Sequence, residues 1–281
     1  MRVTLAPGAG FCFGVRRAVE LAEKTVARAA GPVATLGPLI HNPTVVQSLA
    51  KRGVRAVRTP EEAAGGTLII RSHGAPPEVF AAAARLGLTV VDATCPFVRK
   101  AQRLARRLAE GGYQVVIVGD PEHPEIQAVA AGAGPALVAA DAADLPASDL
   151  RPRVGVVCQT TMAPEPLARV AGALAPRCRE LVVHNTICTA TFDRQRAAAE
   201  LAKKVEVMVV VGGRESANTA RLAGICREIV PTYQIEGPED LDPDWFRGVG
   251  EVGLAAGAST PVEQIEATRK YLQELTVEGR A

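Results

Sequence analysis

The fold is decided by the stretch TVVDATCP, which occupies residues 89–96 and joins an apolar strand to a cysteine and the start of a helix. Two further stretches repeat this pattern, one leading from Val3-Thr4-Leu5 to Cys12 and one leading from residues 181–187 to Cys188. An arginine-bearing helical run follows each cysteine. The cysteines recur at intervals of roughly 90 residues, about the length of one small α/β unit, so the chain is predicted to contain a threefold internal repeat.

Other landmarks recur in the same phase. At a second junction between a strand and a helix, the three units carry His41, His123 and Asn218. At a third junction they carry His73, Thr160 and Ser259. Each unit also has a short strand followed by acidic residues, at 54–62, 137–144 and 233–240. Four landmarks match in every unit, and this agreement supports the repeat.

Short apolar strands alternate with helical patterns of ten to fifteen residues, which is typical of parallel α/β structure. We expect three small α/β domains, at residues 1–94, 95–187 and 188–281. By the logic of the repeat, the N-terminal strand completes the third unit. The predicted fold is therefore a circular, pseudo-threefold arrangement of three α/β units that brings the three cysteine loops toward a common axis.

Composition limits the classes of function. Of 281 residues, 48% are hydrophobic, as in a folded globular protein, and 32 basic residues against 30 acidic ones give no strong field for nucleic acid or an anionic membrane. No apolar run reaches the roughly 18 residues that span a bilayer, and no signal peptide is evident, so we expect a cytoplasmic protein. In that reducing compartment, six cysteines favour metal ligation over a disulfide framework.

Three converging thiolates suit a soft metal centre. Zinc sites usually take four protein ligands, or three and a reactive water, whereas iron–sulfur clusters bind cysteine thiolates readily. A cubane held by Cys12, Cys95 and Cys188 would leave one iron without a protein ligand, and that iron could bind a substrate oxygen. Cys158, Cys178 and Cys226 lack the phase of the repeat and are interpreted as structural thiols.

The polar landmarks offer several hydrogen-bond donors at helix N-termini, which suits an anion such as a diphosphate. These candidates are His41, His73, His123, Ser216, Asn218 and Ser259, with Thr160 and Glu125 also present. Glu125 is the natural proton source, because it is the one carboxylate on a loop otherwise made of ligand-type residues.

Motifs spread in order along nearly the whole chain resemble the 4-hydroxy-3-methylbut-2-enyl diphosphate reductase family. They are GFCFGV at 10–15, IHN at 40–42, SHG at 72–74, DATCP at 92–96, HPE at 123–125, QTT at 159–161, RQ at 194–195, SAN at 216–218 and AGAS at 256–259. One departure is Ala217, where the family commonly has a second serine.

The resemblance implies a trefoil of α/β domains around a [4Fe–4S] cluster bound by Cys12, Cys95 and Cys188, which oxidation could convert to [3Fe–4S]. It implies that His41, His73, His123, Ser216, Asn218 and Ser259 hold the substrate diphosphate. It further implies that the substrate hydroxyl coordinates the open iron with the help of Thr160 and Glu125, and that His123 is a catalytic residue as well as a diphosphate ligand. The reaction would be the reductive dehydroxylation that ends the methylerythritol phosphate route to isoprenoids, with isopentenyl and dimethylallyl diphosphate as products. The expected electron donor is ferredoxin or flavodoxin, and neither nucleic acid nor a membrane is an expected partner.

Two other classes of function compete with the reductase. A three-cysteine zinc lyase or hydrolase would contain zinc and need no reductant. An iron–sulfur sensor or phosphate-binding module would hold a cluster without turnover. The arginine-rich helical faces at 99–107 and 194–204 are interpreted as solvated surfaces, although one of them could dock an acidic electron carrier.

Overall fold

The structure is a computed structural model that describes residues 1–147 and 150–278. In this part of the chain the strands form three parallel sheets of four strands each. The expected fold class, three small α/β modules, is confirmed. The grouping of the modules about one centre and their boundaries at residues 94 and 187 stay predictions.

Contacts divide the chain into two compact units. Unit 1 comprises residues 1–16, 41–46 and 189–281, and unit 2 comprises residues 17–40 and 47–188. Unit 1 contains one of the sheets and unit 2 contains the other two.

The first sheet of unit 2 has the strand order β3-β2-β4-β5. Helix α3 packs on it through Ala83, Val79 and Phe80. The elements of this module are α1 (Phe13–Arg28), β2 (Val33–Leu36), α2 (Pro43–Lys51), β3 (Val54–Val57), η1 (Pro60–Ala63), β4 (Thr67–Ile70), α3 (Pro77–Arg85) and β5 (Thr89–Asp92). The first residues of α1, at 13–16, and of α2, at 43–46, are assigned to unit 1.

The second sheet of unit 2 has the order β7-β6-β8-β9. The elements of this module are α4 (Pro96–Glu110), β6 (Gln114–Val118), α5 (Pro124–Ala133), β7 (Ala136–Ala139), η2 (Ala142–Asp144), β8 (Arg153–Cys158), α6 (Pro164–Leu174), η3 (Ala175–Arg177) and β9 (Glu180–Val183).

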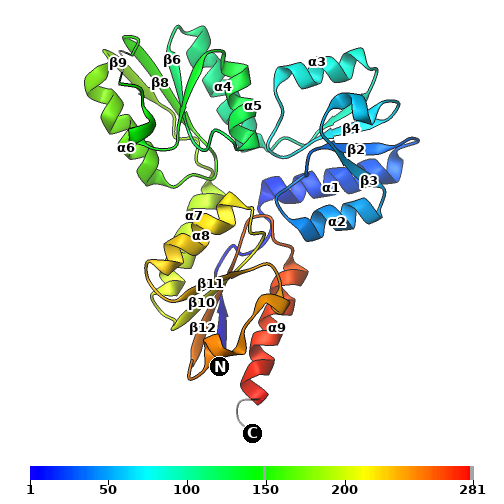
Figure 1. The fold of residues 1–281 in the computed structure, drawn as a ribbon, viewed down its shortest axis with the longest axis vertical. Helices are drawn as coiled ribbons and strands as arrows, with labels where there is room; N and C mark the ends of the chain where they lie inside the picture. The colour runs from blue at the N-terminus through cyan, green and yellow to red at the C-terminus, as the bar shows by residue number, and fades with distance from the viewer. Residues whose placement is uncertain (148–149, 279–281) are drawn as a thin grey trace. The chain divides into compact units, whose positions relative to one another are not determined.

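The central strand β6 shows why the sheet is covered on both faces. Val115 and Ile117 pack with α4 and α5, whereas Val116 and Val118 pack with α6. Because successive side chains of a strand point to opposite faces, an uninterrupted run of buried apolar residues requires helices on both sides. Figure 1 shows α4 and α6 flanking this sheet.

The sheet of unit 1 has the order β1-β12-β10-β11, so the first strand of the chain lies beside the last one. Its elements are β1 (Arg2–Leu5), α7 (Thr189–Ala202), β10 (Val207–Val211), α8 (Ala217–Arg227), β11 (Thr232–Ile235), η4 (Pro238–Asp240), η5 (Pro243–Phe246), β12 (Glu251–Ala256) and α9 (Val262–Glu278).

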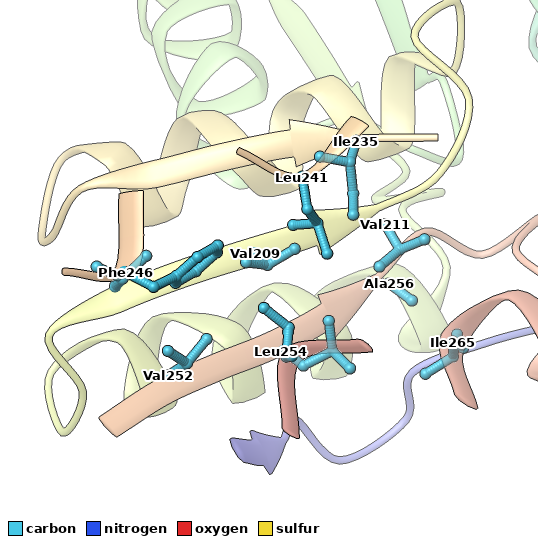
Figure 2. Close-up of a cluster of buried hydrophobic side chains, with 11 residues drawn as sticks. Val209, Val211, Ile235, Leu241, Phe246, Val252, Leu254, Ala256 and Ile265 are labelled. Atoms are coloured by element: carbon cyan, nitrogen blue, oxygen red, sulfur yellow. The ribbon is translucent and has the colours of Figure 1, made fainter. Parts of the chain in front are cut away.

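The same alternation organises the core of unit 1. Val209 and Val211 of β10 belong to a buried cluster with Leu254 of β12 and Ile265 of α9, and Figure 2 draws these side chains. Met208 and Val210 face α7 and α8 on the other side of the sheet. Among the described residues, no helix is long and apolar enough to cross a membrane.

Two expectations about α7 are wrong. The sequence pattern predicts a helix at 194–203, but the helix begins at Thr189, five residues earlier. Its arginine-rich face is also not wholly solvated, because Arg194 is only 5% exposed. The polar stretch after Cys188 reads as a loop, but packing buries Thr191, Arg194 and Gln195 along one side of the helix and so extends it.

Candidate active site

The three cysteines of the repeat occupy equivalent positions in the structure. Each directly precedes a helix: Cys12 precedes α1, Cys95 is the N-cap of α4, and Cys188 precedes α7. Each backbone N–H donates to a carbonyl oxygen at the third junction of a module. Cys95 N lies 2.9 Å from Ser72 O, Cys188 N lies 3.0 Å from Thr160 O, and Cys12 N lies 3.1 Å from Ala258 O.

These settings suit thiolate ligands. The side chains of all three cysteines are half-buried. The N-terminus of a helix presents backbone N–H groups and a partial positive charge to an anion. At Cys12 the N–H of Val15 points to Sγ at 3.5 Å. The donor set of three thiols at helix N-termini therefore fits a cluster of iron and sulfide better than a hard cation such as Mg²⁺.

Glu125 and Thr160 form a buried pair in unit 2. Glu125 lies in the first turn of α5 and is 2% exposed, and Thr160 lies just after β8 and is 5% exposed. Thr160 donates to both carboxylate oxygens, from its backbone N to Oε1 at 2.6 Å and from its Oγ1 to Oε2 at 2.8 Å. Burial raises the pKa of Glu125 to about 7, although the two hydrogen bonds from Thr160 act in the opposite direction. This carboxyl can therefore hold a proton near neutral pH.

His123 caps the helix that carries Glu125. Its Nδ1 accepts the backbone N–H of Glu125 at 3.2 Å. An imidazole that accepts through Nδ1 is neutral and carries its proton on Nε2. His73 lies beside it, with the two ring centroids 5.4 Å apart and the ring planes at 89°. In this state His123 offers an anion one hydrogen bond but no positive charge.

In unit 1, Ser216 and Asn218 lie at the start of α8. Ser216 is the N-cap, and its Oγ accepts the backbone N–H of Thr219 at 3.3 Å. Asn218 is 7% exposed. Its Nδ2 has no hydrogen-bond partner among the described residues. A buried amide donor without a partner costs about 1–3 kcal/mol, so its placement at a helix N-terminus favours a site that an anion completes.

Ser259 has a different local role in the structure. Its Oγ donates to the backbone carbonyl of His41 at 2.9 Å and so holds the loop that carries this histidine. To donate to a phosphate, the hydroxyl has to turn away from that carbonyl. The same loop is held by Asn42, whose Oδ1 caps α2 and whose Nδ2 lies 3.3 Å from Gln264 Oε1.

Three positioning side chains were given no role by sequence reasoning, namely Asn42, Gln159 and Arg194. Gln159 Oε1 accepts the N–H of Asp120 at 3.1 Å and thereby joins the second and third junctions of its module. Each of the three lies in a quoted motif, but a motif does not reveal the distant residue that its side chain contacts.

The candidate residues thus fall into two groups. Unit 1 holds Cys12, His41, Ser216, Asn218 and Ser259. Unit 2 holds Cys95, Cys188, His73, His123, Glu125 and Thr160. The meeting of the two groups in one site stays a prediction.

Comparisons with known proteins agree with the motifs. The sequence profile of the LytB protein family matches residues 3–273. The 4-hydroxy-3-methylbut-2-enyl diphosphate reductase of Geotalea uraniireducens is 46% identical over 96% of this chain and 99% of its own length. The enzyme of the same name from Aquifex aeolicus is 45% identical over 97% of this chain and 96% of its own length.

Two solved structures share the fold. One is described as (E)-4-hydroxy-3-methyl-but-2-enyl diphosphate reductase, the terminal enzyme of the non-mevalonate pathway. It is 44% identical, with a TM-score of 0.73 over 98% of this chain and 100% of that one. The reductase from Plasmodium falciparum is 27% identical, with a TM-score of 0.87 over 98% of this chain and 88% of that one. The chain belongs to the LytB protein family.

Proposed function

We propose that this chain catalyses the reaction for which its relatives are named, the reductive removal of the hydroxyl group of (E)-4-hydroxy-3-methylbut-2-enyl diphosphate. Two electrons and two protons enter, the C–O bond breaks, and the oxygen leaves as water. The remaining allyl group gains one of the protons at either end, which gives isopentenyl or dimethylallyl diphosphate. The electrons come from a low-potential carrier of the cytoplasm, ferredoxin or flavodoxin.

The observation that carries this proposal is the set of contacts made by Thr160. Its N and Oγ1 bind the carboxylate of Glu125, while its carbonyl oxygen accepts the N–H of Cys188. One residue therefore connects a buried acid to a candidate metal ligand. A protein that only binds diphosphate has no need for such a link.

The pair can deliver a proton without admitting bulk water. Glu125 Oε1 accepts a backbone N–H, which can only donate, so the transferable proton of the carboxyl belongs on Oε2. Oε2 faces the hydroxyl of Thr160, which can accept that proton while giving its own to the departing oxygen. We assign Glu125 as the proton source and Thr160 as the group that passes the proton on.

The diphosphate is assigned to the hydrogen-bond donors that the repeat places at the second and third junctions of its units. Asn218 offers its buried amide, Ser216 its hydroxyl and His123 its Nε2–H, and the N-termini of α5 and α8 add partial positive charge. His41, His73 and Ser259 complete the proposed set. Such donors bind the anion in the absence of a lysine because hydrogen bonds to charged groups contribute roughly 1.5–3 kcal/mol each.

Cys12, Cys95 and Cys188 would hold a [4Fe–4S] cluster. When bound, this group supplies single electrons and an iron atom without a protein ligand. The role of the chain is to present three thiolates at helix N-termini and a proton donor beside one of them.

The decisive test compares two triple variants of anaerobically purified protein. Wild type should contain about four irons and four sulfides per chain. C12A/C95A/C188A should contain neither, while the matched variant C158A/C178A/C226A should keep both, because those three thiols lie outside the repeat. Stoichiometric zinc without sulfide would overturn the proposal in favour of a zinc lyase or hydrolase.

A second measurement separates an enzyme from a sensor. Wild type with reduced methyl viologen as electron donor should convert the allylic diphosphate into the two products, and E125Q should not. A full complement of iron and sulfide in wild type without turnover would assign the chain to an iron–sulfur sensor instead.

A further inference from the structure

A groove of about 400 Å³ in unit 2 lies outside the proposed active-site residues. Its basic wall is a face of α4 that carries Arg99, Arg103 and Arg106. Its apolar wall includes Phe80 of α3 and Ala128 of α5.

The arginines of the groove share one face of the helix. Residues spaced by four and then three positions lie one above the other on a helix, so these three side chains form a row about 10 Å long. Helix α4 as a whole carries five basic residues and a single acidic one, Glu110 at its last position. The row is therefore a concentrated positive charge on a protein whose total charge is close to neutral.

Most of this charge is not neutralised within the chain. Arg99 forms an ion pair with Asp92 at 2.8 Å. Arg103 and Arg106 are exposed and form no ion pair with any described residue. Two unneutralised arginines above an apolar wall present a surface that an acidic partner can bind.

The row begins next to Cys95. The backbone N–H of Arg99 donates to the carbonyl of Cys95 at 2.9 Å, so the first arginine lies one helical turn from this cysteine. Arg17 adds a further guanidinium on the strand side, where it donates to the carbonyl oxygens of Thr94 at 3.2 Å and Asp92 at 3.5 Å. A partner seated on the groove would thus lie close to a proposed cluster ligand.

We infer that this groove is the docking surface for an acidic one-electron carrier protein. The inference rests on the proposed function, because only a redox centre at Cys95 gives such a carrier a reason to bind there. Each docking event oxidises one carrier by one electron and reduces the centre by one, so two events supply one turnover. An open groove with a row of charges suits the surface of a protein and its steering at long range.

The test uses the holoprotein and a ferredoxin of strongly negative net charge. R103E/R106E reverses the charge inside the groove, and K100E/R107E makes the same change in charge on the same helix outside it. Calorimetry should show that ferredoxin binds at least about ten-fold more weakly to R103E/R106E, whereas K100E/R107E loses less than about three-fold. R103K/R106K, which keeps the charge, should bind like wild type. Binding to wild type should weaken as salt is raised, and binding to R103E/R106E should depend much less on salt.

Turnover distinguishes failure of this inference from failure of the proposed function. With reduced methyl viologen, which needs no docking surface, all three variants should turn over like wild type, whereas ferredoxin-driven turnover should fall only in R103E/R106E.

Equal losses of ferredoxin binding in the two charge-reversed variants, or no loss in either, would overturn the groove as a docking surface. Binding of inorganic diphosphate to wild type but not to R103E/R106E, with ferredoxin binding unchanged, would assign the groove to a small anion instead. Wild type that is inactive with methyl viologen would contradict the proposed function, while the calorimetric comparison would still report on the groove.

Discussion

The guanidinium of Arg194 donates to the carbonyl oxygen of Gly8 from both Nε, at 3.0 Å, and Nη2, at 2.6 Å. Nη2 also lies 2.7 Å from the carbonyl oxygen of Gly10. These bonds join α7, the helix that follows Cys188, to the loop that leads into Cys12. A guanidinium has several N–H donors in one plane, so it can bind two carbonyl oxygens of fixed position at once, which a lysine ammonium group does less well. Arg194 is therefore a positioning residue for Cys12.

We expect R194M to lower the free energy of unfolding of unit 1 by about 3 kcal/mol, because it removes charge-assisted hydrogen bonds and leaves the carbonyl of the buried Gly10 without this donor. R194K should lose less, because it keeps one donor and the charge. Trp245, the one tryptophan of the chain, lies in unit 1, so urea unfolding followed by its fluorescence measures this change. The exposed neighbour variant R196M is the control and should shift the free energy by less than about 0.5 kcal/mol. Similar stabilities of R194M and R196M would contradict the assigned role.

The pH dependence of stability tests the environment of Glu125. Its folded-state pKa of about 7 lies above the ordinary value of 4.5. A carboxyl with a raised pKa contributes its full stability below the unfolded value, and that stability is lost as pH rises through the folded value. The loss from pH 4.5 to pH 7 is on the order of 3 kcal/mol. E125Q cannot ionise, so its free energy of unfolding relative to wild type should rise between about pH 5 and pH 8.

The protonation state of Glu125 should also control the rate of the proposed reaction. Turnover with methyl viologen should decline as pH rises above about 7, because the acid must be protonated to act. If stability instead changes with pH in the same way for wild type and E125Q, the carboxyl is not the buried acid that its contacts indicate.

Much of the fold could be predicted because local patterns of apolar residues indicate most of its strands and helices. The sequence pattern predicts strands at 33–36, 89–92 and 207–211, and these are the bounds of β2, β5 and β10 in the structure, since buried parallel strands are short apolar runs with abrupt ends. Helix α7 was placed too late because Thr189–Asp193 has weak helix propensity. Burial of Thr191 and Arg194 extends the helix, and such tertiary packing has no local signal.

The site was less accessible to sequence reasoning than the fold. Repeat phase identified Cys12, Cys95 and Cys188, and the structure gives their backbone N–H groups equivalent partners. The sequence repeat could not identify the contact of Arg194 with Gly8, because these residues are separated by 186 positions and no periodicity relates them. Likewise, the turn of the Ser259 hydroxyl toward His41 depends on packing between distant loops.

The hydroxyl of Thr160 is the second point at which proton delivery can be tested. T160S keeps a hydroxyl that can bind Glu125 Oε2 and should retain most of the activity. T160V lacks it and should lose about 10²–10⁴-fold in turnover number. The carbonyl that accepts the N–H of Cys188 belongs to the backbone, so iron and sulfide content should be unchanged in both variants. Equal activity of T160V and T160S would remove Thr160 from the proton path.

Asn218 should show opposite effects on stability and on substrate binding. Its buried Nδ2 lacks a partner among the described residues, so N218L, which is similar in shape, should unfold at the same urea concentration as wild type or a higher one. In contrast, the Kd for the substrate diphosphate should rise about ten-fold to a hundred-fold, because one hydrogen bond to a charged group is lost. N218D keeps the shape but places a carboxylate against the anion, so it should bind more weakly than N218L. Calorimetric titration measures these constants without turnover. A destabilised N218L that binds the diphosphate like wild type would show that the amide serves the fold and not the ligand.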